Sequence, residues 1–203
     1  MFIDETKFKK LCKQAYDGMG IRIGRDERGM WTIGTGWWSL MIHGEDMTNK
    51  LLATLTEIVG ELPQKGEAYK YMAKNSPESE SFGMNVMEKF NAAHITWTFT
   101  NVLIRTSGDQ IEVMECIQNK EWKTFIPHKI FELFSEKNLK EDEIFPEYGF
   151  STDEDDKWIV WGSNTMWFGA MQRPPRFIGE QNFMNAIKDV NAWWTNNTED
   201  FIG

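Results

Sequence analysis

The residues of this chain that could do chemistry are few and scattered. The sequence holds three histidines, two cysteines and 31 acidic residues. His43 lies in HGED, beside Glu45 and Asp46, but residues of one turn cannot converge on a metal without remote partners. Asp46 also stands where a following helix needs its N-cap. His94 and His128 have no partner visible in the sequence. We therefore interpret all three histidines as structural.

The patterns expected of a nucleophile, a cation loop or a phosphate loop are incomplete. Cys12 falls on the apolar face of a predicted helix, whereas an activated thiolate needs a polar, accessible setting. Cys12 and Cys116 form no CxxC motif, and we expect both to be reduced thiols. The acidic run at 153–156 lacks the alternating oxygen ligands and the glycine of a calcium loop. We expect no catalytic residue, no metal and no cofactor.

Acidic charge gathers in residues 136–157, where nine carboxylates face three lysines, in a chain of net charge −9. Carboxylates without partners stay in water, because burying an unpaired charge is costly. Their proximity to exposed aromatic rings would suit a basic partner. The carboxylates predicted to be solvated and to contact that partner are Glu141, Asp142, Glu143, Asp153, Glu154, Asp155 and Asp156. Trp161 is predicted to contact the partner with them.

Ten tryptophans, fourteen phenylalanines and twelve methionines are an unusual load of large apolar side chains. In the predicted strand at 158–162, alternation places Trp158 on one face and Trp161 on the other. Such a strand indicates either helices on both faces of a sheet or one aromatic face that binds a partner. Burial explains most of these rings, and an aromatic patch beside the acidic segment is the other interpretation.

Hydrophobic periodicity predicts an α+β protein with a mainly antiparallel sheet. Helices and hairpin strands mix in it without a βαβ alternation. Amphipathic helices are expected at 5–16, 46–59, 67–74, 86–93, 128–137 and 180–194. Strands are expected at 21–23, 30–35, 37–43, 95–100, 102–106, 111–117, 158–162 and 166–171.

Two stretches of the chain, 26–41 and 153–171, are similar and predict an internal duplication of a helix-plus-hairpin unit. We expect one compact domain that holds two related lobes, 1–75 and 125–203, around a strand-rich middle at 76–124. The matched residues are Trp31 with Trp158, Trp38 with Trp167 and Met41 with Met171.

A helix followed by three antiparallel strands, met twice, resembles at fold level the repeat of DNA sliding clamps. The resemblance implies a clamp-like module that contacts phosphate through a lysine-rich helix, although no sequence motif supports it and a fold does not convey a function. Residues 1–30 carry seven bases against five acids. The phosphate contacts of this alternative would be Lys7, Lys9, Lys10, Lys13, Arg22 and Arg25.

The leading hypothesis is a non-enzymatic intracellular protein whose acidic, tryptophan-rich face binds a basic, nucleic-acid-binding protein. One form of it is a phage or mobile-element inhibitor, such as an anti-CRISPR protein or a nucleic-acid mimic. Direct nucleic-acid binding is not expected from the net charge of −9. We expect neither a signal peptide nor a membrane span. A further alternative is an enzyme with a dispersed carboxylate site, drawn from residues such as Glu45, Asp46 and Glu115.

Overall fold

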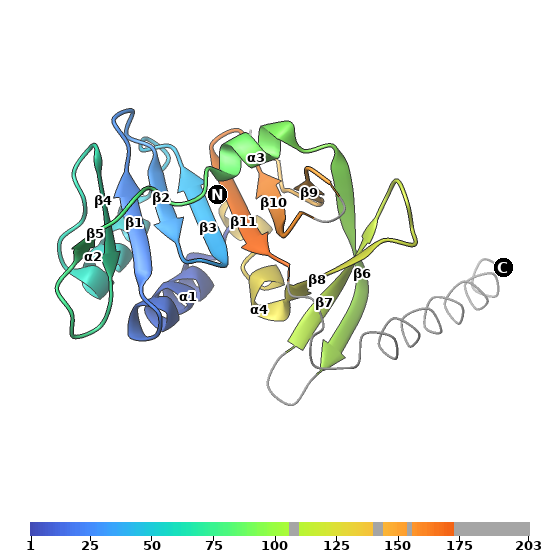
Figure 1. Cartoon of the computed structure of the whole chain (residues 1–203), viewed down its shortest axis with the longest axis horizontal. Helices are drawn as coiled ribbons and strands as arrows, with labels where there is room; N and C mark the ends of the chain where they lie inside the picture. Colours follow the sequence, from blue (N-terminus) through green and yellow to red (C-terminus); the bar gives the residue numbers. More distant parts are fainter. Residues whose placement is uncertain (106–109, 140–143, 154–155, 173–203) are drawn as a thin grey trace. The chain divides into compact units, whose positions relative to one another are not determined.

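The computed structural model describes residues 1–105, 110–139, 144–153 and 156–172. The chain divides into the units Met1–Gln172 and Arg173–Gly203, and every described residue belongs to the first. The first unit is an α+β structure built on one antiparallel sheet of eleven strands (Figure 1), which confirms the predicted fold class. The sheet order is β5-β4-β1-β2-β3-β11-β10-β9-β6-β7-β8.

Along the described chain each α-helix is followed by a run of two or three strands. The helices among the described residues are α1 (Glu5–Asp17), α2 (Asn49–Val59), α3 (Val86–Ala92) and α4 (His128–Phe131), with a 3-10 turn, η1, at Glu136–Asn138. The strands are β1 (Ile21–Arg25), β2 (Trp31–Gly34), β3 (Trp38–Ile42), β4 (Glu67–Tyr71), β5 (Glu78–Ser79), β6 (Ile95–Arg105), β7 (Gln110–Cys116), β8 (Lys123–Pro127), β9 (Gly149–Ser151), β10 (Trp158–Gly162) and β11 (Met166–Met171).

Helix caps fix the starts of α1 and α2. Asp4 caps α1, because its carboxylate accepts hydrogen bonds from the backbone N–H groups of Thr6 and Lys7. The cap of α2 is Thr48 rather than Asp46, since the Thr48 hydroxyl accepts from the Leu51 N–H at 3.1 Å. The helix therefore begins three residues later than the apolar pattern indicated.

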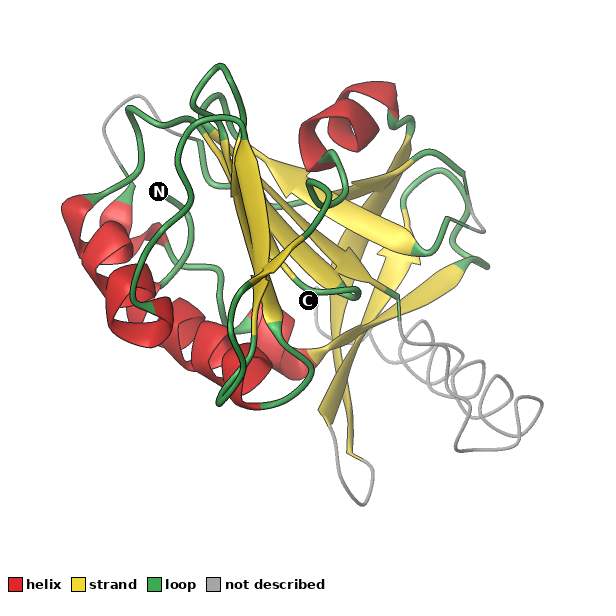
Figure 2. Cartoon of the chain, turned by 60° about the vertical axis from the view of Figure 1, so that its left-hand side comes forward, coloured by secondary structure: helices red, strands yellow, loops and turns green. Residues whose placement is uncertain are grey.

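Helices lie on both sides of the strands (Figure 2), so both faces of the sheet carry apolar side chains. Neighbouring strand residues alternate between two hydrophobic clusters. Trp161 and Phe168 lie in the larger cluster with residues of α1, α2 and α4, whereas Val160 and Trp167 lie in a smaller one with Val86 of α3. Trp161 and Trp167 are 0% and 7% exposed, so burial, the first interpretation, explains an aromatic ring on each face of the hairpin, whereas Trp158 is half-buried.

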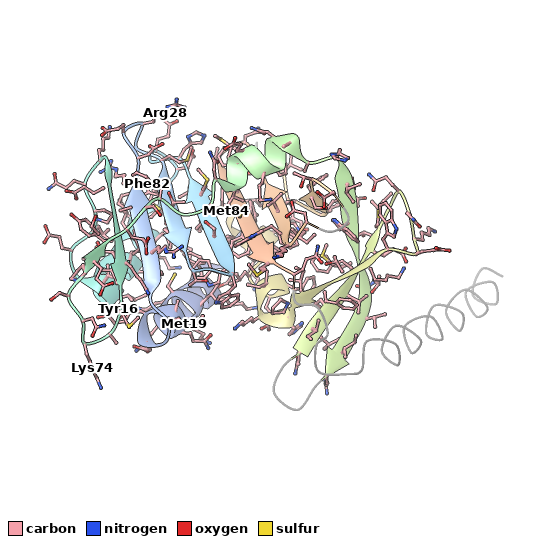
Figure 3. The ribbon with its side chains drawn as sticks, viewed as in Figure 1. Tyr16, Met19, Arg28, Lys74, Phe82 and Met84 are labelled. Atoms are coloured by element: carbon pink, nitrogen blue, oxygen red, sulfur yellow. The ribbon has the colours of Figure 1, made fainter. Side chains whose placement is uncertain are left out.

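Residues 80–85, here called the strap, cross the α3 face of the first strands (Figure 1). Phe82 and Met84 of the strap lie over these strands in Figure 3. The crossing is close because Gly24 of β1 has no Cβ, and a Cβ there would lie 2.8 Å from the Phe82 ring. The strap then joins α3, whose Val86 N–H points at the Met41 sulfur, 3.1 Å away.

Both halves of the sheet contain a helix followed by three antiparallel strands, α1-β1-β2-β3 and α4-β9-β10-β11, and β3 pairs with β11. In each β-hairpin the last pair joins a glycine, Gly34 or Gly162, to the residue five positions later. Aligning these glycines matches Trp31 to Ile159 rather than to Trp158. Trp31 and Trp158 thus lie on corresponding strands, β2 and β10, but their positions differ by one residue. The internal duplication therefore stays a prediction.

Three predicted elements differ from the structure for physical reasons. Residues 67–71 form β4 instead of a helix, because they pair along the whole length of β1; seven or eight residues are too few for an independent helix. The strands expected at 95–100 and 102–106 are one strand, β6, which bends at Asn101 (φ 60°) without ending.

The helix predicted at 128–137 stops at Phe131 because the chain beyond it joins the N-terminal segment. The Asp4 N–H donates to the Leu133 carbonyl, and the Ser135 N–H donates to the Phe2 carbonyl. Ile3 and Phe134 form an isolated antiparallel bridge between these donors. The helix expected at 180–194 lies outside the described residues. Within the described part of the chain, no helix is long and apolar enough to cross a membrane.

Candidate functional site

Residues 144–148, here called the ridge, carry the most exposed apolar side chains near the predicted acidic face. Ile144 is 77% exposed and Tyr148 is 41% exposed. Between them Pro146 is buried, and Phe145 packs against the main core. The Glu147 N–H donates to the Phe145 carbonyl, 3.0 Å away, and forms a tight turn. The ridge is therefore anchored in the middle and presents apolar groups at both ends.

A groove on one side of the ridge, the β9 groove, has a volume of about 470 Å³. Tyr148, Phe150 and Phe90 line it with Ser163 and Asn164 of the β10–β11 turn. The Phe90 ring meets the Phe150 ring edge-on, with centroids 5.4 Å apart. This wall joins α3 to β9, so it is held by two elements of the fold rather than by a loop alone.

A second groove, the α4 groove, lies on the other side of the ridge and has a volume of about 420 Å³. Its residues come from α1, β6, the α4 region and the ridge: Lys7, Phe99, His128, Phe131, Glu132, Phe134, Phe145, Pro146 and Glu147. The Phe99 and Phe131 rings are 4.7 Å apart, and Phe134 lies 5.0 Å from the buried ring of Trp161. The groove wall therefore rests directly on the core.

His128 is held in the α4 groove by a buried carboxylate. Its Nδ1 is 2.6 Å from Oε1 of Glu112, a β7 residue whose side chain is 7% exposed. Since a carboxylate only accepts at neutral pH, Nδ1 carries the proton and donates it. The other ring nitrogen, Nε2, is 4.0 Å from Glu132. Glu112 is thus the partner of His128 that the sequence did not reveal.

The structure describes only part of the predicted acidic face. Glu141, Asp142, Glu143, Glu154 and Asp155 lie outside the described residues. Asp153 is exposed, as predicted. Trp161 is completely buried, so it does not belong to an exposed surface, and the proposal below omits it.

Asp156 is a structural residue rather than a solvated one. Its carboxylate accepts hydrogen bonds from the Thr152 hydroxyl at 2.7 Å, the Trp158 N–H at 3.1 Å and the Lys89 ammonium at 3.0 Å. The side chain is only 8% exposed. Burial raises the pKa of Asp156, but the hydrogen bonds from Thr152, Lys89 and Trp158 outweigh it and hold the pKa below its ordinary value. Asp156 thus ties α3 to the β9–β10 turn.

The bases of the nucleic-acid alternative do not form one free surface. Lys7 is 3.9 Å from Glu132, and Lys9 pairs with Glu57 of α2. Arg22 of β1 lies 3.4 Å from Glu80 of the strap, on the sheet face opposite the main core. Lys10 and Lys13 are exposed on α1, and Arg25 lies over the Trp31 ring at 5.1 Å. Of the two arginines only Arg22 is on the far face of β1, whereas Arg25 is on the same face as the core residue Trp31, and this distribution disfavours a single phosphate track.

The carboxylates named for a dispersed enzyme site do not converge. Glu45 and Asp46 directly follow β3, whereas Glu115 belongs to β7 and pairs with Lys123 of β8. Five strand spacings separate β3 from β7 in the sheet order, which corresponds to about 24 Å. Among the described residues, no group of three or more histidine, cysteine or acidic side chains is placed to hold a metal ion. Cys12 is buried, and this burial raises the pKa of its thiol.

Comparison with known proteins gives no family: no family model matches the chain, and no curated protein matches it. The grooves themselves could not be found from the sequence, because Phe99, Phe131 and Phe134 come from two distant segments. The one available signal was the apolar stretch IFPEY at 144–148 within an otherwise acidic region.

Proposed function

We propose that this protein is a non-enzymatic interaction protein that binds a basic protein partner through the ridge and the two grooves beside it. The observation that carries the proposal is the exposure of Ile144 and Tyr148, at 77% and 41%, beside two grooves lined with aromatic rings. Exposed apolar groups gathered around concave aromatic surfaces are typical of protein-binding sites.

The charge of the region favours a basic partner. Residues 136–157 have nine acids and three lysines, and Glu132 and Glu147 line the α4 groove. Negative potential around an apolar contact accelerates association with a positive surface and disfavours acidic competitors. A protein that normally binds nucleic acid offers such a surface. Charge complementarity therefore favours one form of the proposal. In this form the protein is a phage or mobile-element inhibitor that occupies the nucleic-acid site of its partner.

Affinity capture from the native cell, with matched variants, tests the proposal. Ile144→Ser removes the most exposed side chain of the ridge, and Met19→Ser removes one that is 68% exposed in the turn after α1 (Figure 3). We expect the wild type and Met19→Ser to retain the same basic protein and Ile144→Ser to lose it. Equal retention by all three proteins would remove the ridge from the interface.

A salt series on the captured complex separates charge from apolar contact. If carboxylates steer the partner, the association rate falls as ionic strength rises, while the dissociation rate changes little. An association rate that does not respond to salt would contradict the electrostatic part of the proposal.

A further inference from the structure

Glu147 lines both grooves, but of the two only the α4 groove is also lined by Lys7, His128 and Glu132. Besides the rings of Phe99, Phe131 and Phe134 it is lined by Glu132 and Glu147. Both carboxylates are on exposed residues, so neither belongs to a buried hydrogen-bond network. A groove with aromatic walls and carboxylates at its rim has the chemistry that accepts an alkyl cation. The rings cover the apolar stem and attract the positive charge, and the carboxylates pair with it.

A lysine of this chain already stands at the rim. Lys7 of α1 lines the groove, and its ammonium is 3.9 Å from Glu132 Oε1, with both side chains almost half exposed. This separation is at the long limit of an ion pair, and such an exposed contact contributes little. A better-placed cation can therefore replace Lys7 at Glu132.

The groove floor is unsuited to an anion. Glu112 lies behind His128 and accepts its Nδ1–H, so this proton is directed into the protein and is not offered to a ligand in the groove. The carboxylates of Glu112, Glu132 and Glu147 outnumber the ammonium of Lys7 in the groove and its floor. A phosphate or carboxylate ligand would meet repulsion here.

We propose that the α4 groove binds the side chain of a lysine or arginine of the partner protein, with its stem against Phe99 and Phe131 and its charge between Glu132 and Glu147. This inference rests on the proposed function, because it names the group by which a basic partner is anchored at the same surface.

The inference is tested on the isolated protein, without the partner. The probe is n-butylguanidinium, and n-butylurea is the uncharged control of nearly the same shape. Binding is followed by NMR through the aromatic carbon signals of labelled phenylalanines. We expect n-butylguanidinium to shift the signals of Phe99, Phe131 and Phe134, and n-butylurea to leave them unchanged. Equal shifts with both compounds, or shifts confined to other phenylalanines, would overturn the inference.

Charge-removing variants show whether the carboxylates of the α4 groove strengthen n-butylguanidinium binding and whether Lys7 weakens it. Replacing both carboxylates, Glu132→Gln with Glu147→Gln, should weaken n-butylguanidinium binding about tenfold, from two exposed pairs. Glu45→Gln, an exposed residue after β3, is the control for a general change in net charge and should have almost no effect. Lys7→Gln should strengthen binding about twofold, because it removes the competing cation. Weaker binding by Lys7→Gln would contradict the proposed geometry.

The two proposals fail separately. If a basic protein is captured through the ridge but n-butylguanidinium does not bind, the α4 groove is not the anchor and the proposed function stands. If n-butylguanidinium binds as described but Ile144→Ser captures the same proteins as the wild type, the groove accepts a cation and the proposed interface is wrong.

Discussion

Asp156 offers the sharpest test of the structure, because the sequence places it in a solvated acidic turn and the structure buries it. Replacing it by asparagine keeps the shape and one acceptor oxygen but removes the charge that Lys89 meets at 3.0 Å. Hydrogen bonds to charged groups contribute about 1.5–3 kcal/mol each. Lys89 is still 32% exposed and can regain water, which keeps the cost below that of a fully buried pair. We expect Asp156→Asn to lose about 2 kcal/mol of unfolding free energy at neutral pH.

The assay is denaturation of the full chain by urea and by heat. A loss of about 2 kcal/mol corresponds to a fall in melting temperature of about 4–8 °C for a unit of this size. Asp153→Asn, three residues earlier and exposed, makes the same change in net charge and should stay within about 0.5 kcal/mol of the wild type. Equal stability of the two variants would refute the structural role of Asp156.

The pH dependence gives a second readout with a definite sign. The pKa of Asp156 is lower in the folded protein than its ordinary value, so ionisation of this carboxyl stabilises the folded state. That contribution is complete above the unfolded pKa of about 3.9 and is lost as the pH falls through the lower folded pKa. The difference in unfolding free energy between the wild type and Asp156→Asn should therefore be constant from pH 7 to about pH 5 and become smaller below about pH 4. A gap that widens on acidification would contradict the assignment.

Three further predictions concern stability and are checked by urea denaturation. Gly34→Ala should cost at least about 1–3 kcal/mol, because its Cβ would lie 2.4 Å from the Trp38 carbonyl oxygen, whereas Gly36→Ala meets nothing within 4 Å and should be neutral or slightly stabilising; equal effects would contradict the hairpin geometry. Trp31→Ala should cost about 3–5 kcal/mol, since the ring is 5% exposed, and an unchanged midpoint would place it at the surface. Asn101→Val should lower the unfolding free energy by about 1–2 kcal/mol because of the positive φ of 60°, while Asn101→Gly should leave it unchanged. A glycine variant less stable than the valine variant would contradict the positive φ at the bend of β6.

Local sequence patterns were sufficient to predict the elements whose formation depends on residues close together in the chain. Hydrophobic periodicity predicted a helix at 5–16, where α1 spans Glu5–Asp17, and it predicted strands at 158–162 and 166–171, which are the bounds of β10 and β11. Each of these depends on residues close together in the chain. The α+β class follows from the same patterns, because hairpins separated by helices leave few alternatives to an antiparallel sheet.

The errors occurred where distant segments decide the local structure. Residues 67–71 become β4 because β1 offers them an edge, and α4 is cut short because the N-terminal segment pairs with residues 133–135. The candidate site has the same origin. Phe99 and Phe131 lie far apart in the sequence but 4.7 Å apart in the structure, and no periodicity in either segment indicates that contact.

The role of individual charges was also beyond the sequence. Asp153 and Asp156 are alike in the run DEDD, yet only Asp156 meets Lys89 of α3, 67 positions away. Likewise, the sequence suggested the lysines of α1 as phosphate contacts, whereas Lys7 and Lys9 are each opposite a carboxylate of another element. Burial and pairing of a charge depend on the partner's element, which only the fold supplies.

The central claim is that the ridge contacts a basic protein, and site-specific photo-cross-linking tests it most directly. A benzophenone amino acid replaces Ile144 in one protein and Met19 in another, and both are irradiated in extract of the native cell. We expect position 144 to form an adduct with one basic protein, at a peptide rich in lysine or arginine, and position 19 to form none. Adducts at position 19 alone, or an acidic protein joined to position 144, would contradict it.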